Sequence, residues 1–468
     1  MKFTLSELAA VVGVPADGEA SFTGAAVDSR LVRPGDLFVA LPGARVDGHD
    51  FAAEAVVRGS AGVLASRPLP GVASHVPVVV APNTGDVLLR LAGALKRREG
   101  FRLAAIGGSA GKTTTKEFAA AILARHAPVG KTPGNQNSAI GFPLSVLNLS
   151  GRPEWMVGEM GMSAPGEISR LSRTFEPDVA AITLIALEHL EFLGSLEGIA
   201  RANAEILDGL RRDGTFVANA DDPRVSEIAR TRAPNVLRFG QAPDADVRVE
   251  RVALSESGSR FRLKAPSGEA EIALPLPGSH QVSNFVAASA VAIACGASVE
   301  NCAEAAPKLN PSAHRGELRR HGSGALLYDD AYNASPPSMR AALDALKLLP
   351  GKRKIAVLGD MLELGPQSEW WHRETGRYVV GRADRLICVG ALGKFLAEGA
   401  IEGGFPKREI RVLEVPEHAA NLLDTMLDAG DTALFKASRG VGLERAVERL
   451  ARGDLVSEPG RTAGRPSR

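Results

Sequence analysis

The sequence predicts an α/β protein of three domains. Apolar runs followed by polar turns and helical patterns recur along the chain, and its 468 residues exceed one ordinary hydrophobic core. An apolar run also leads directly into a glycine-rich turn near residue 107. We therefore expect four parts: a small α/β domain at 1–99, a central doubly wound sheet at 100–311, a Rossmann-like domain at 312–455, and a disordered tail at 456–468.

Composition indicates a globular protein with no electrostatic reason to bind nucleic acid. Hydrophobic residues make up 45% and charged residues 23%, and 55 Lys and Arg against 54 Asp and Glu leave a net charge of +1. The three cysteines are sparse and lack C-x-x-C spacing, which indicates neither a disulfide framework nor a zinc site. Because the N-terminus does not resemble a signal peptide and no apolar run reaches about 18 residues, we expect a cytoplasmic protein with no membrane span.

The first domain contains a polar turn with two interpretations. The stretch DSRLVRPGDLFVAL, which begins at Asp28, joins this turn to a β-rich run. Asp28, Ser29 and Arg30 fit either an ordinary surface turn or a polar edge of a nucleotide site. Spacing alone does not decide between them.

The stretch LAAIGGSAGKTTTKEFAAAILA, from Leu103 to Ala124, predicts a phosphate-binding loop between a strand and an amphipathic helix. Its glycines can adopt positive φ, which lets backbone N–H groups turn inward around an anion at a helix N-terminus. Lys112 adds a mobile positive charge, and the Thr113 hydroxyl is of the kind that holds Mg²⁺ in such loops. The candidate phosphate-binding residues are Gly108, Ser109, Ala110, Gly111, Lys112, Thr113 and Thr114. The alternative is a glycine-rich turn with a solvated lysine.

Two polar features follow the loop. The stretch TPGNQNSAIG contains the side-chain amides of Asn135, Gln136 and Asn137, which suit contact with a polar ligand and are equally normal in a plain loop. Glu159 ends an apolar strand, where a carboxylate is expensive to bury without a cation. A metal ion would explain a carboxylate at that position.

A further apolar strand, DVAAITLIA, leads to Glu188 and His189. The strands that end near Lys112, Glu159 and His189 thus deliver polar groups at their carboxyl ends, where ligands bind in a doubly wound sheet. We expect these three segments to converge on one crevice. A histidine alone is more often packed or capping than a ligand, and the convergence favours His189 as a ligand. Farther on, Asn284 opens an alanine-rich helix and fits either a helix-start residue or a contact to an adenine edge.

The order of these motifs resembles the Mur ligase family from Asp28 to Glu444. The resemblance rests on GGSAGKTTT, TPGNQNSAIGFPL, GEMGMSAPGEI, EHLEFLGSLEGIARA, NADDP, GSHQVSN, DDAYNASPPSM, LGDMLELG and FKASRG. It implies a UDP-binding first domain, a P-loop ATPase-like central domain and a C-terminal domain that binds the incoming amine. DDAYNASP with LGDMLELG narrows the expected activity to the ATP-dependent joining of D-alanyl-D-alanine to UDP-N-acetylmuramoyl-tripeptide.

The resemblance also implies residue roles for ATP and Mg²⁺. Lys112 would contact the β- and γ-phosphates and be catalytic together with Glu159 and His189. Thr113 and Glu159 would hold a first Mg²⁺, and His189 a second. Nucleotide contacts are further implied for Asn284, Arg315 and Asp330. Substrate contacts are implied for Asp28, Ser29 and Arg30 toward UDP, for Asn135 and Asn137, and for Tyr332, Asn333, Asp360 and Ser438 toward the dipeptide.

The implied reaction needs no protein nucleophile. A peptide carboxylate attacks the γ-phosphate of ATP, and the amine of D-alanyl-D-alanine then displaces phosphate from the resulting acyl phosphate. We expect the enzyme to act as a monomer. A sister ligase with another amine substrate, or a nucleotide-binding homologue with weakened catalysis, is the alternative.

The sequence departs from the family pattern at Asn203, where most of these ligases carry a lysine that becomes carbamylated. An amide nitrogen is not nucleophilic enough to take up CO₂, so the second Mg²⁺ site loses a negative charge. Water, Glu205 or the Asn203 carbonyl would compensate, or that ion binds weakly. Smaller departures are Gly107, Ser138, Ser335 and Ala437.

Overall fold

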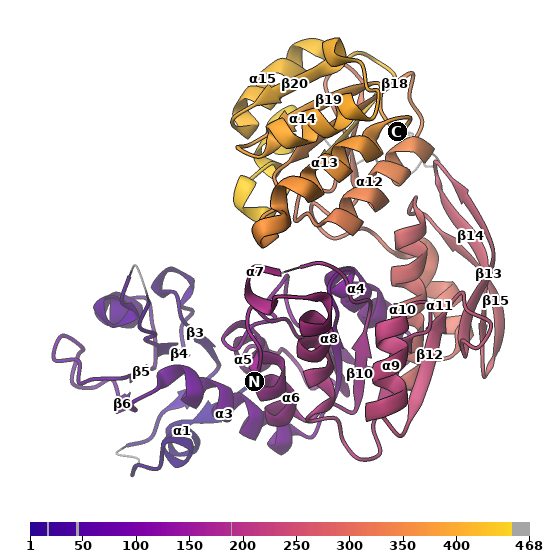
Figure 1. Cartoon of the computed structure of the whole chain (residues 1–468). Coiled ribbons are helices and arrows are strands. Elements are labelled where there is room, and N and C mark those ends of the chain that lie inside the picture. The colour runs from indigo at the N-terminus through magenta and orange to yellow at the C-terminus, as the bar shows by residue number, and fades with distance from the viewer. Residues whose placement is uncertain (16–17, 44–45, 189, 452–468) are drawn as a thin grey trace, which may run out of the picture.

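The computed structural model describes residues 1–15, 18–43, 46–188 and 190–451. It consists of three α/β units that follow one another in the chain, as the sequence predicts. The first unit lies to one side of the central unit, and the C-terminal unit stands above the central one (Figure 1). The predicted disordered tail at 456–468 lies outside the described residues.

The first unit is built on a parallel sheet in the order β3-β4-β5-β6, and a short antiparallel pair, β1 and β2, precedes it. Thr4 and Glu7 form a capping box at the start of helix α1, and Gly13, at φ +87°, ends it. The strands are β1 (Phe3–Thr4), β2 (Ser21–Phe22), β3 (Gly24–Ala26), β4 (Asp36–Val39), β5 (Gly62–Ala65) and β6 (Val78–Val80). The helices are α1 (Leu5–Val12), α2 (Ala52–Val57) and α3 (Thr84–Glu99).

The central unit has a mixed sheet in the order β15-β14-β13-β12-β11-β10-β7-β9-β8. The strands from β7 to β13 pair in parallel with one another, and β14 and β15 extend the sheet beyond β13 in antiparallel pairs. The strands are β7 (Arg102–Gly107), β8 (Val129–Lys131), β9 (Trp155–Glu159), β10 (Val179–Ile182), β11 (Thr215–Asn219), β12 (Val236–Gly240), β13 (Val247–Ser255), β14 (Gly258–Ala265) and β15 (Gly268–Leu274). The helices are α4 (Lys112–Leu123), α5 (Gly141–Leu147), α6 (Glu167–Phe175), α7 (Leu190–Leu193), α8 (Leu196–Ala204), α9 (Pro223–Arg232), α10 (Ser279–Ala294) and α11 (Val299–Ala305).

Strand β7 is central to the position of the site. Its neighbours in the sheet are β9 on one side and β10 on the other, although β8 follows it in the chain. The chain moves outward from β7 to the edge strand β8 and then progresses in the opposite direction across the sheet, past β7 to β10. Such a change of direction opens a crevice at the carboxyl ends of these strands. Several buried strand residues, such as Ala104, Val157 and Ala180, are small or β-branched and are covered by helices on both faces of the sheet.

The C-terminal unit has the sheet order β16-β17-β21-β18-β19-β20, in which β16 alone of the described strands runs antiparallel. The strands are β16 (Glu317–Arg320), β17 (Leu326–Asp329), β18 (Arg353–Gly359), β19 (Arg385–Val389), β20 (Ile410–Leu413) and β21 (Asp431–Lys436). The helices are α12 (Pro336–Leu348), α13 (Ser368–Val379), α14 (Gly393–Glu402), α15 (Pro416–Met426) and α16 (Glu444–Leu450). No helix in the described part of the chain is long and apolar enough to span a membrane.

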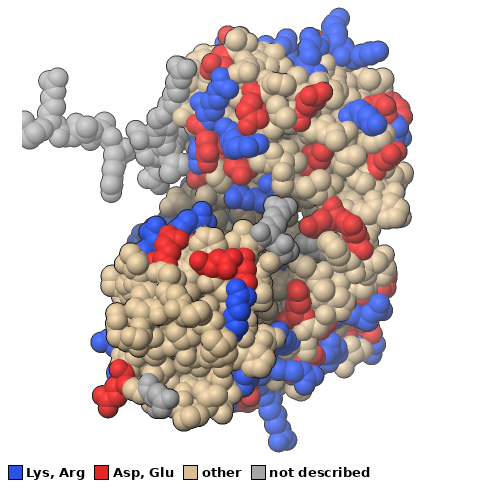
Figure 2. Space-filling model, turned by 90° about the vertical axis from the view of Figure 1, so that its left-hand side faces the viewer, with Lys and Arg blue, Asp and Glu red and all other residues tan. Residues whose placement is uncertain are grey.

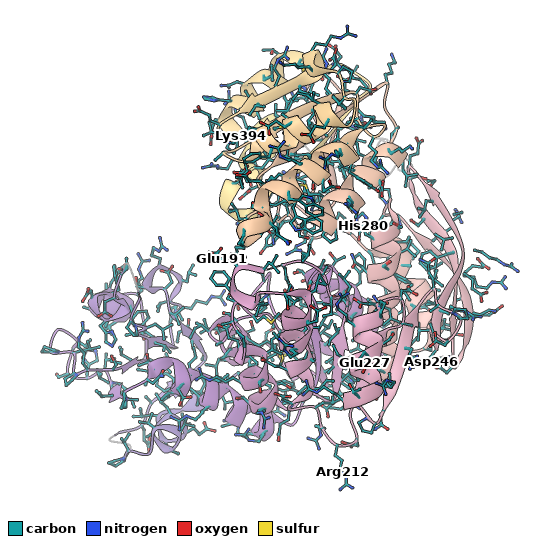
Figure 3. All side chains as sticks on the ribbon, viewed as in Figure 1. Glu191, Arg212, Glu227, Asp246, His280 and Lys394 are labelled. Atoms are coloured by element: carbon teal, nitrogen blue, oxygen red, sulfur yellow. The ribbon has the colours of Figure 1, made fainter. Side chains whose placement is uncertain are left out.

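Two different junctions connect the three units. The first unit packs on the central unit through α3 and α5, and the side chain of Asn148 forms two hydrogen bonds with the backbone of Ala25 in β3. The C-terminal unit contacts α7 through a hydrogen bond from the Glu191 amide to the Glu363 carbonyl, 3.2 Å long. Figure 3 shows Glu191 on the side of the central unit that faces the C-terminal unit.

Replacing Asn148 by alanine tests the first junction. Its amide accepts from the Ala25 N–H at 3.0 Å and donates to the Ala25 carbonyl at 2.8 Å, so it completes the edge of the first sheet. We expect Asn148→Ala to lower local stability by about 1 kcal/mol and to accelerate amide hydrogen exchange in β3. Asn310→Ala, which removes an exposed amide elsewhere, serves as the control. Unchanged exchange in β3 would contradict this role.

Candidate active site

The predicted phosphate-binding loop follows β7 and ends at the first residue of α4. Gly108 has φ +119° and Gly111 has φ +80°, values that residues with a side chain rarely adopt. A Cβ on Gly108 would overlap the Thr183 hydroxyl, and a Cβ on Gly111 would overlap the Asn284 amide. The loop therefore needs glycine at both positions for backbone conformation and for close approach.

Residues at the end of β10 hold the loop in this shape. The Thr183 hydroxyl lies 2.7 Å from the Ala110 carbonyl and 3.2 Å from the Gly107 carbonyl. The Ser109 amide donates to the Leu184 carbonyl at 2.7 Å. The loop is thus fixed by a strand that lies more than seventy residues farther along the chain.

Asn203, on α8, also braces the loop. Its Oδ1 accepts from the Gly108 amide at 2.8 Å, and its Nδ2 donates to the Ile199 carbonyl at 3.0 Å. The residue is 1% exposed. Its amide oxygen is therefore engaged by the loop backbone, which disfavours the predicted role of that oxygen as a compensating metal ligand.

Glu205 is likewise engaged elsewhere. Its two carboxylate oxygens accept from the Gly166 amide at 2.7 Å and the Ser169 amide at 3.2 Å, at the start of α6. These bonds satisfy amides that have no partner inside the helix. Glu205 is thus a helix cap here, which disfavours it as the compensating carboxylate.

Lys112 bends back over the loop. Its ammonium donates to the Gly108 carbonyl at 2.6 Å and lies 3.3 Å from the Glu188 carboxylate. Its side chain is 16% exposed. A phosphate entering the loop would therefore meet a cation that is already positioned, with carbonyl oxygens as its other partners.

Glu159 is a buried carboxylate held by neutral donors. It is 2% exposed, and its oxygens accept from the Thr113 hydroxyl at 2.7 Å and the Asn137 amide at 2.8 Å. Among the described residues, no ion pair to Glu159 is found. A buried carboxylate without a cation is costly, and hydroxyl and carboxylate oxygens are the ligands that Mg²⁺ prefers. Thr113 and Glu159 therefore fit a magnesium ion.

Sequence reasoning missed Lys116, which positions the asparagine-containing loop. Its ammonium is completely buried, donates to the Thr132 and Gly134 carbonyls at 2.7 Å each, and pairs with Glu117 at 3.0 Å. The loop that it fixes carries Asn137. The sequence signal is a lysine four residues after Lys112 on the same helix, but periodicity alone does not show which element covers it.

The loop opens into a cavity of about 560 Å³ between the central and C-terminal units. The space-filling view shows that the molecule narrows beneath the C-terminal unit (Figure 2). Predicted site residues that line the cavity are Ser109, Ala110, Gly111, Lys112, Thr113, Thr114, Asn135, Asn137, Glu159, Asn284, Arg315, Asp330, Tyr332, Asn333 and Ser438. The predicted convergence of strand ends on one crevice is therefore observed for Lys112 and Glu159, whereas His189 lies outside the described residues.

The C-terminal side of the cavity is cationic and aromatic. Arg315 stacks on the Tyr332 ring with its guanidinium carbon 3.8 Å from the ring centre, and Arg439 approaches the same ring at 5.2 Å. Asp330 pairs with the buried Lys436 at 2.5 Å. Lys436, like Arg439, was not among the predicted site residues, although both lie in the FKASRG motif.

His280 lies at the top of α10, where the central unit meets the C-terminal unit (Figure 3). Burial lowers its pKa, while the Asp330 carboxylate acts in the opposite direction. The ring lines the same cavity as Asn284, which is one helical turn away. The N-terminal end of α10 thus forms part of the wall of the site.

Two predicted dipeptide contacts are engaged within the C-terminal unit. Burial raises the pKa of Asp360, whose carboxylate accepts from the Leu392 amide at 3.0 Å and does not line the cavity. The Ser438 hydroxyl accepts from the Leu362 amide at 2.9 Å and so positions a loop on the cavity wall. Asp360 thus contacts the backbone of its own unit and is not in the cavity wall.

The turn at Asp28 lies in the first unit and does not line this cavity. Asp28 pairs with Arg30 at 2.7 Å, and the Ser29 hydroxyl donates to Glu54 at 3.1 Å. Arg30 keeps 77% of its side chain exposed. The geometry is that of a surface turn, and the sequence-based assignment of these residues to UDP remains a prediction.

Comparison with known families gives three matches. The profile for the Mur ligase middle domain matches residues 106–292. The profile described as Mur ligase, glutamate ligase domain matches 314–439, and the one described as Mur ligase family, catalytic domain matches 21–93. Together these matches extend over all three units.

Several similar proteins share one name, which states the two substrates that they join. The UDP-N-acetylmuramoyl-tripeptide--D-alanyl-D-alanine ligase of Bacillus subtilis (strain 168) is 38% identical over 438 residues, which covers 93% of each chain. The enzyme of that name from Mycobacterium tuberculosis (strain H37Rv) is 37% identical and covers 91% of this chain and 92% of its own.

Similar solved structures carry the same kind of name. A crystal structure of MurF from Acinetobacter baumannii has a TM-score of 0.85 at 30% identity and covers 96% of this chain and 99% of its own. The MurF ligase from Thermotoga maritima, in complex with ADP, has a TM-score of 0.77 at 32% identity and covers 91% and 96%.

Replacing Asn203 by leucine tests its role as a brace. The variant leaves the buried Gly108 amide without its acceptor, which costs about 1–3 kcal/mol. We expect faster amide exchange in the loop and a lower free energy of unfolding, measured by mass spectrometry and urea titration. Asn310→Ala, which removes an exposed amide elsewhere in the chain, serves as the control and should leave both measurements unchanged. Equal exchange in the leucine variant and the unmodified chain would show that the loop holds its shape without Asn203.

Proposed function

The chain belongs to the Mur ligase family, and we propose that it catalyses the ATP-dependent joining of D-alanyl-D-alanine to UDP-N-acetylmuramoyl-tripeptide. The reaction completes the pentapeptide precursor of peptidoglycan and releases ADP and phosphate. The observation that carries the proposal is one cavity with two halves: a phosphate-binding loop on the central unit faces cationic and hydrogen-bonding residues of the C-terminal unit. A step that joins an activated acid to an amine needs such a shared compartment.

The nucleotide would bind across the loop. Lys112 and the amides between Gly108 and Thr114 suit the phosphates, because the loop presents backbone donors at the start of α4. Asn284 suits the adenine, since its amide lies against Gly111 and lines the same cavity as the loop. Arg315 and Asp330 would reach the nucleotide from the C-terminal unit.

A magnesium ion would be held by Thr113 and Glu159. When bound, such an ion neutralises negative charge on the phosphates during phosphoryl transfer. The residues fit because Glu159 is buried, has no cationic partner among the residues that the structure describes, and accepts from the Thr113 hydroxyl at 2.7 Å. His189 remains the predicted ligand of a second ion.

The chemistry joins two substrates through an acyl phosphate. The tripeptide carboxylate oxygen forms a bond to the γ-phosphorus, and the bond from that phosphorus to the β,γ-bridging oxygen breaks to release ADP. The dipeptide amine then attacks the acyl carbon, loses a proton and displaces inorganic phosphate. Lys112 and the loop amides stabilise the transferring phosphoryl group, and closure of the two units excludes water that would hydrolyse the intermediate.

We assign the remaining substrate contacts by unit. The segment 1–99 would bind the UDP moiety through Asp28, Ser29 and Arg30, and the segment 312–455 would bind the dipeptide near Tyr332, Asn333, Asp360 and Ser438. The central segment, 100–311, would present the tripeptide carboxylate near Asn135 and Asn137. ATP as a substrate favours the cytoplasm as the place of reaction.

Measuring ADP release by the purified chain tests this function. We expect release that requires both UDP-N-acetylmuramoyl-tripeptide and D-alanyl-D-alanine, and much less with single amino acids as the amine. Release with a different amine would indicate a sister ligase. Nucleotide binding without turnover would indicate a homologue that has lost catalysis.

Lys112→Ala connects this activity to the loop. The change removes one pre-positioned donor to the transferring phosphoryl group, and we expect turnover to fall about 100- to 1,000-fold. Lys394→Ala, which changes an exposed lysine on α14 (Figure 3), should leave turnover unchanged. Near-normal turnover by Lys112→Ala would remove the loop from the mechanism.

Bicarbonate provides a further test. Because Asn203 cannot take up CO₂ and its side chain is occupied by Gly108 and Ile199, we expect the rate to be the same in CO₂-depleted buffer and in buffer with added bicarbonate. Mass spectrometry of the intact chain should find no carbamate in this segment. Stimulation by bicarbonate would indicate that a lysine other than residue 203 is carbamylated in the site.

A further inference from the structure

Glu188 places a second carboxylate beside the phosphate-binding loop. It follows β10, and its Oε2 lies 3.3 Å from the ammonium of Lys112. Its side chain is 15% exposed and lines the same cavity as Glu159. The loop lysine is therefore paired with an acid that comes from a different strand than the Glu159 carboxylate.

This ion pair must change when a nucleotide binds. Lys112 now donates to the carbonyls of Gly108 and Ser109 and to Glu188. Phosphates in the loop would attract the ammonium more strongly than neutral carbonyls do, and they would then face the carboxylate of Glu188 at close range. Like charges in a partly buried site repel strongly unless a cation lies between them.

Three other acids of this region form interactions of their own. Glu205 caps α6, Asp330 pairs with Lys436, and Glu167 accepts from the Ser163 amide at 2.6 Å. Asn203, which the family resemblance aligns with a carboxylate-bearing lysine, is neutral and bonded to the loop. Glu188 is the described acid that contacts the loop lysine directly.

We propose that Glu188 is the carboxylate ligand of a second divalent cation in the nucleotide complex and supplies the charge that Asn203 lacks. In the structure described here the same carboxylate lies 3.3 Å from the Lys112 ammonium. The proposal rests on the proposed function, because it requires a nucleotide in this loop. Under this proposal the Glu188 carboxylate leaves the Lys112 ammonium and binds the metal ion when the nucleotide is present.

Counting bound Mn²⁺ tests the proposal without measuring turnover. The full chain is saturated with a nonhydrolysable ATP analogue and titrated with Mn²⁺, with free Mn²⁺ followed by electron paramagnetic resonance. We expect Glu188→Gln to bind the second Mn²⁺ at least about tenfold more weakly than the unmodified chain, because even loss of a supporting partner of a metal ligand costs about 10–100-fold. Glu205→Gln, which changes the rival carboxylate, should retain both ions.

Nucleotide affinity with and without the cation separates a ligand from a merely structural residue. Without divalent cations, Glu188→Gln should bind the analogue as tightly as the unmodified chain or more tightly, because a negative charge beside the phosphates is gone. With saturating Mn²⁺ its binding should be weaker than that of the unmodified chain. A structural role would weaken binding in both conditions and would overturn the proposal.

The outcomes distinguish this proposal from the proposed function. An unmodified chain that binds no analogue would refute the nucleotide site itself. A chain that binds the analogue with equal Mn²⁺ affinity in Glu188→Gln would refute only the role of Glu188. Loss of the second ion in Glu205→Gln alone would assign the ligand to Glu205 instead.

Discussion

The close approach between the phosphate-binding loop and the end of β10 is the constraint on which the site depends. A side chain on Gly108 would occupy the space of the Thr183 hydroxyl, so the loop, β7 and β10 can only pack together with glycine at that position. This approach places Lys112, Glu159 and Glu188 around one opening, because they follow three adjacent parallel strands. The strand order of the sheet therefore determines which charges meet.

The second requirement is a cavity that two units share. The central unit supplies backbone donors and carboxylates, and the C-terminal unit supplies Arg315, Lys436 and the Tyr332 ring. The described contacts between the two units include one hydrogen bond between α7 and the 361–365 loop and the packing of α10 against α12, besides the chain connection near residue 312. Such a limited contact allows the C-terminal unit to move relative to the loop, which suits a reaction that must admit three substrates and then exclude water.

The sequence predicted the fold class and the core of the site because both are local. Phosphate binding is indicated by glycines at fixed offsets and a lysine at the helix start, and metal binding by an apolar strand that ends in Glu159. Parallel strands then bring these carboxyl ends together at one edge of the sheet. Lys116 was missed because its partners, Thr132 and Gly134, are set by packing between elements. Asp360 is predicted to contact the substrate, and the pattern does not show that its carboxylate also accepts from the Leu392 amide. Which way a polar side chain turns depends on neighbours that a linear pattern does not contain.

Asn203 fixes the conformation of the loop, and Glu188 supplies a negative charge beside it. An asparagine can accept from the Gly108 amide and donate to the Ile199 carbonyl at the same time, whereas an ammonium has no acceptor for that amide. Asn203 therefore stabilises the loop as a lysine cannot, but it contributes no charge toward a cation. The carboxylate that we propose for a second cation has to come from an element that already touches the loop. The end of β10 meets this condition, because it braces the loop through Thr183 and carries Glu188 a few residues later.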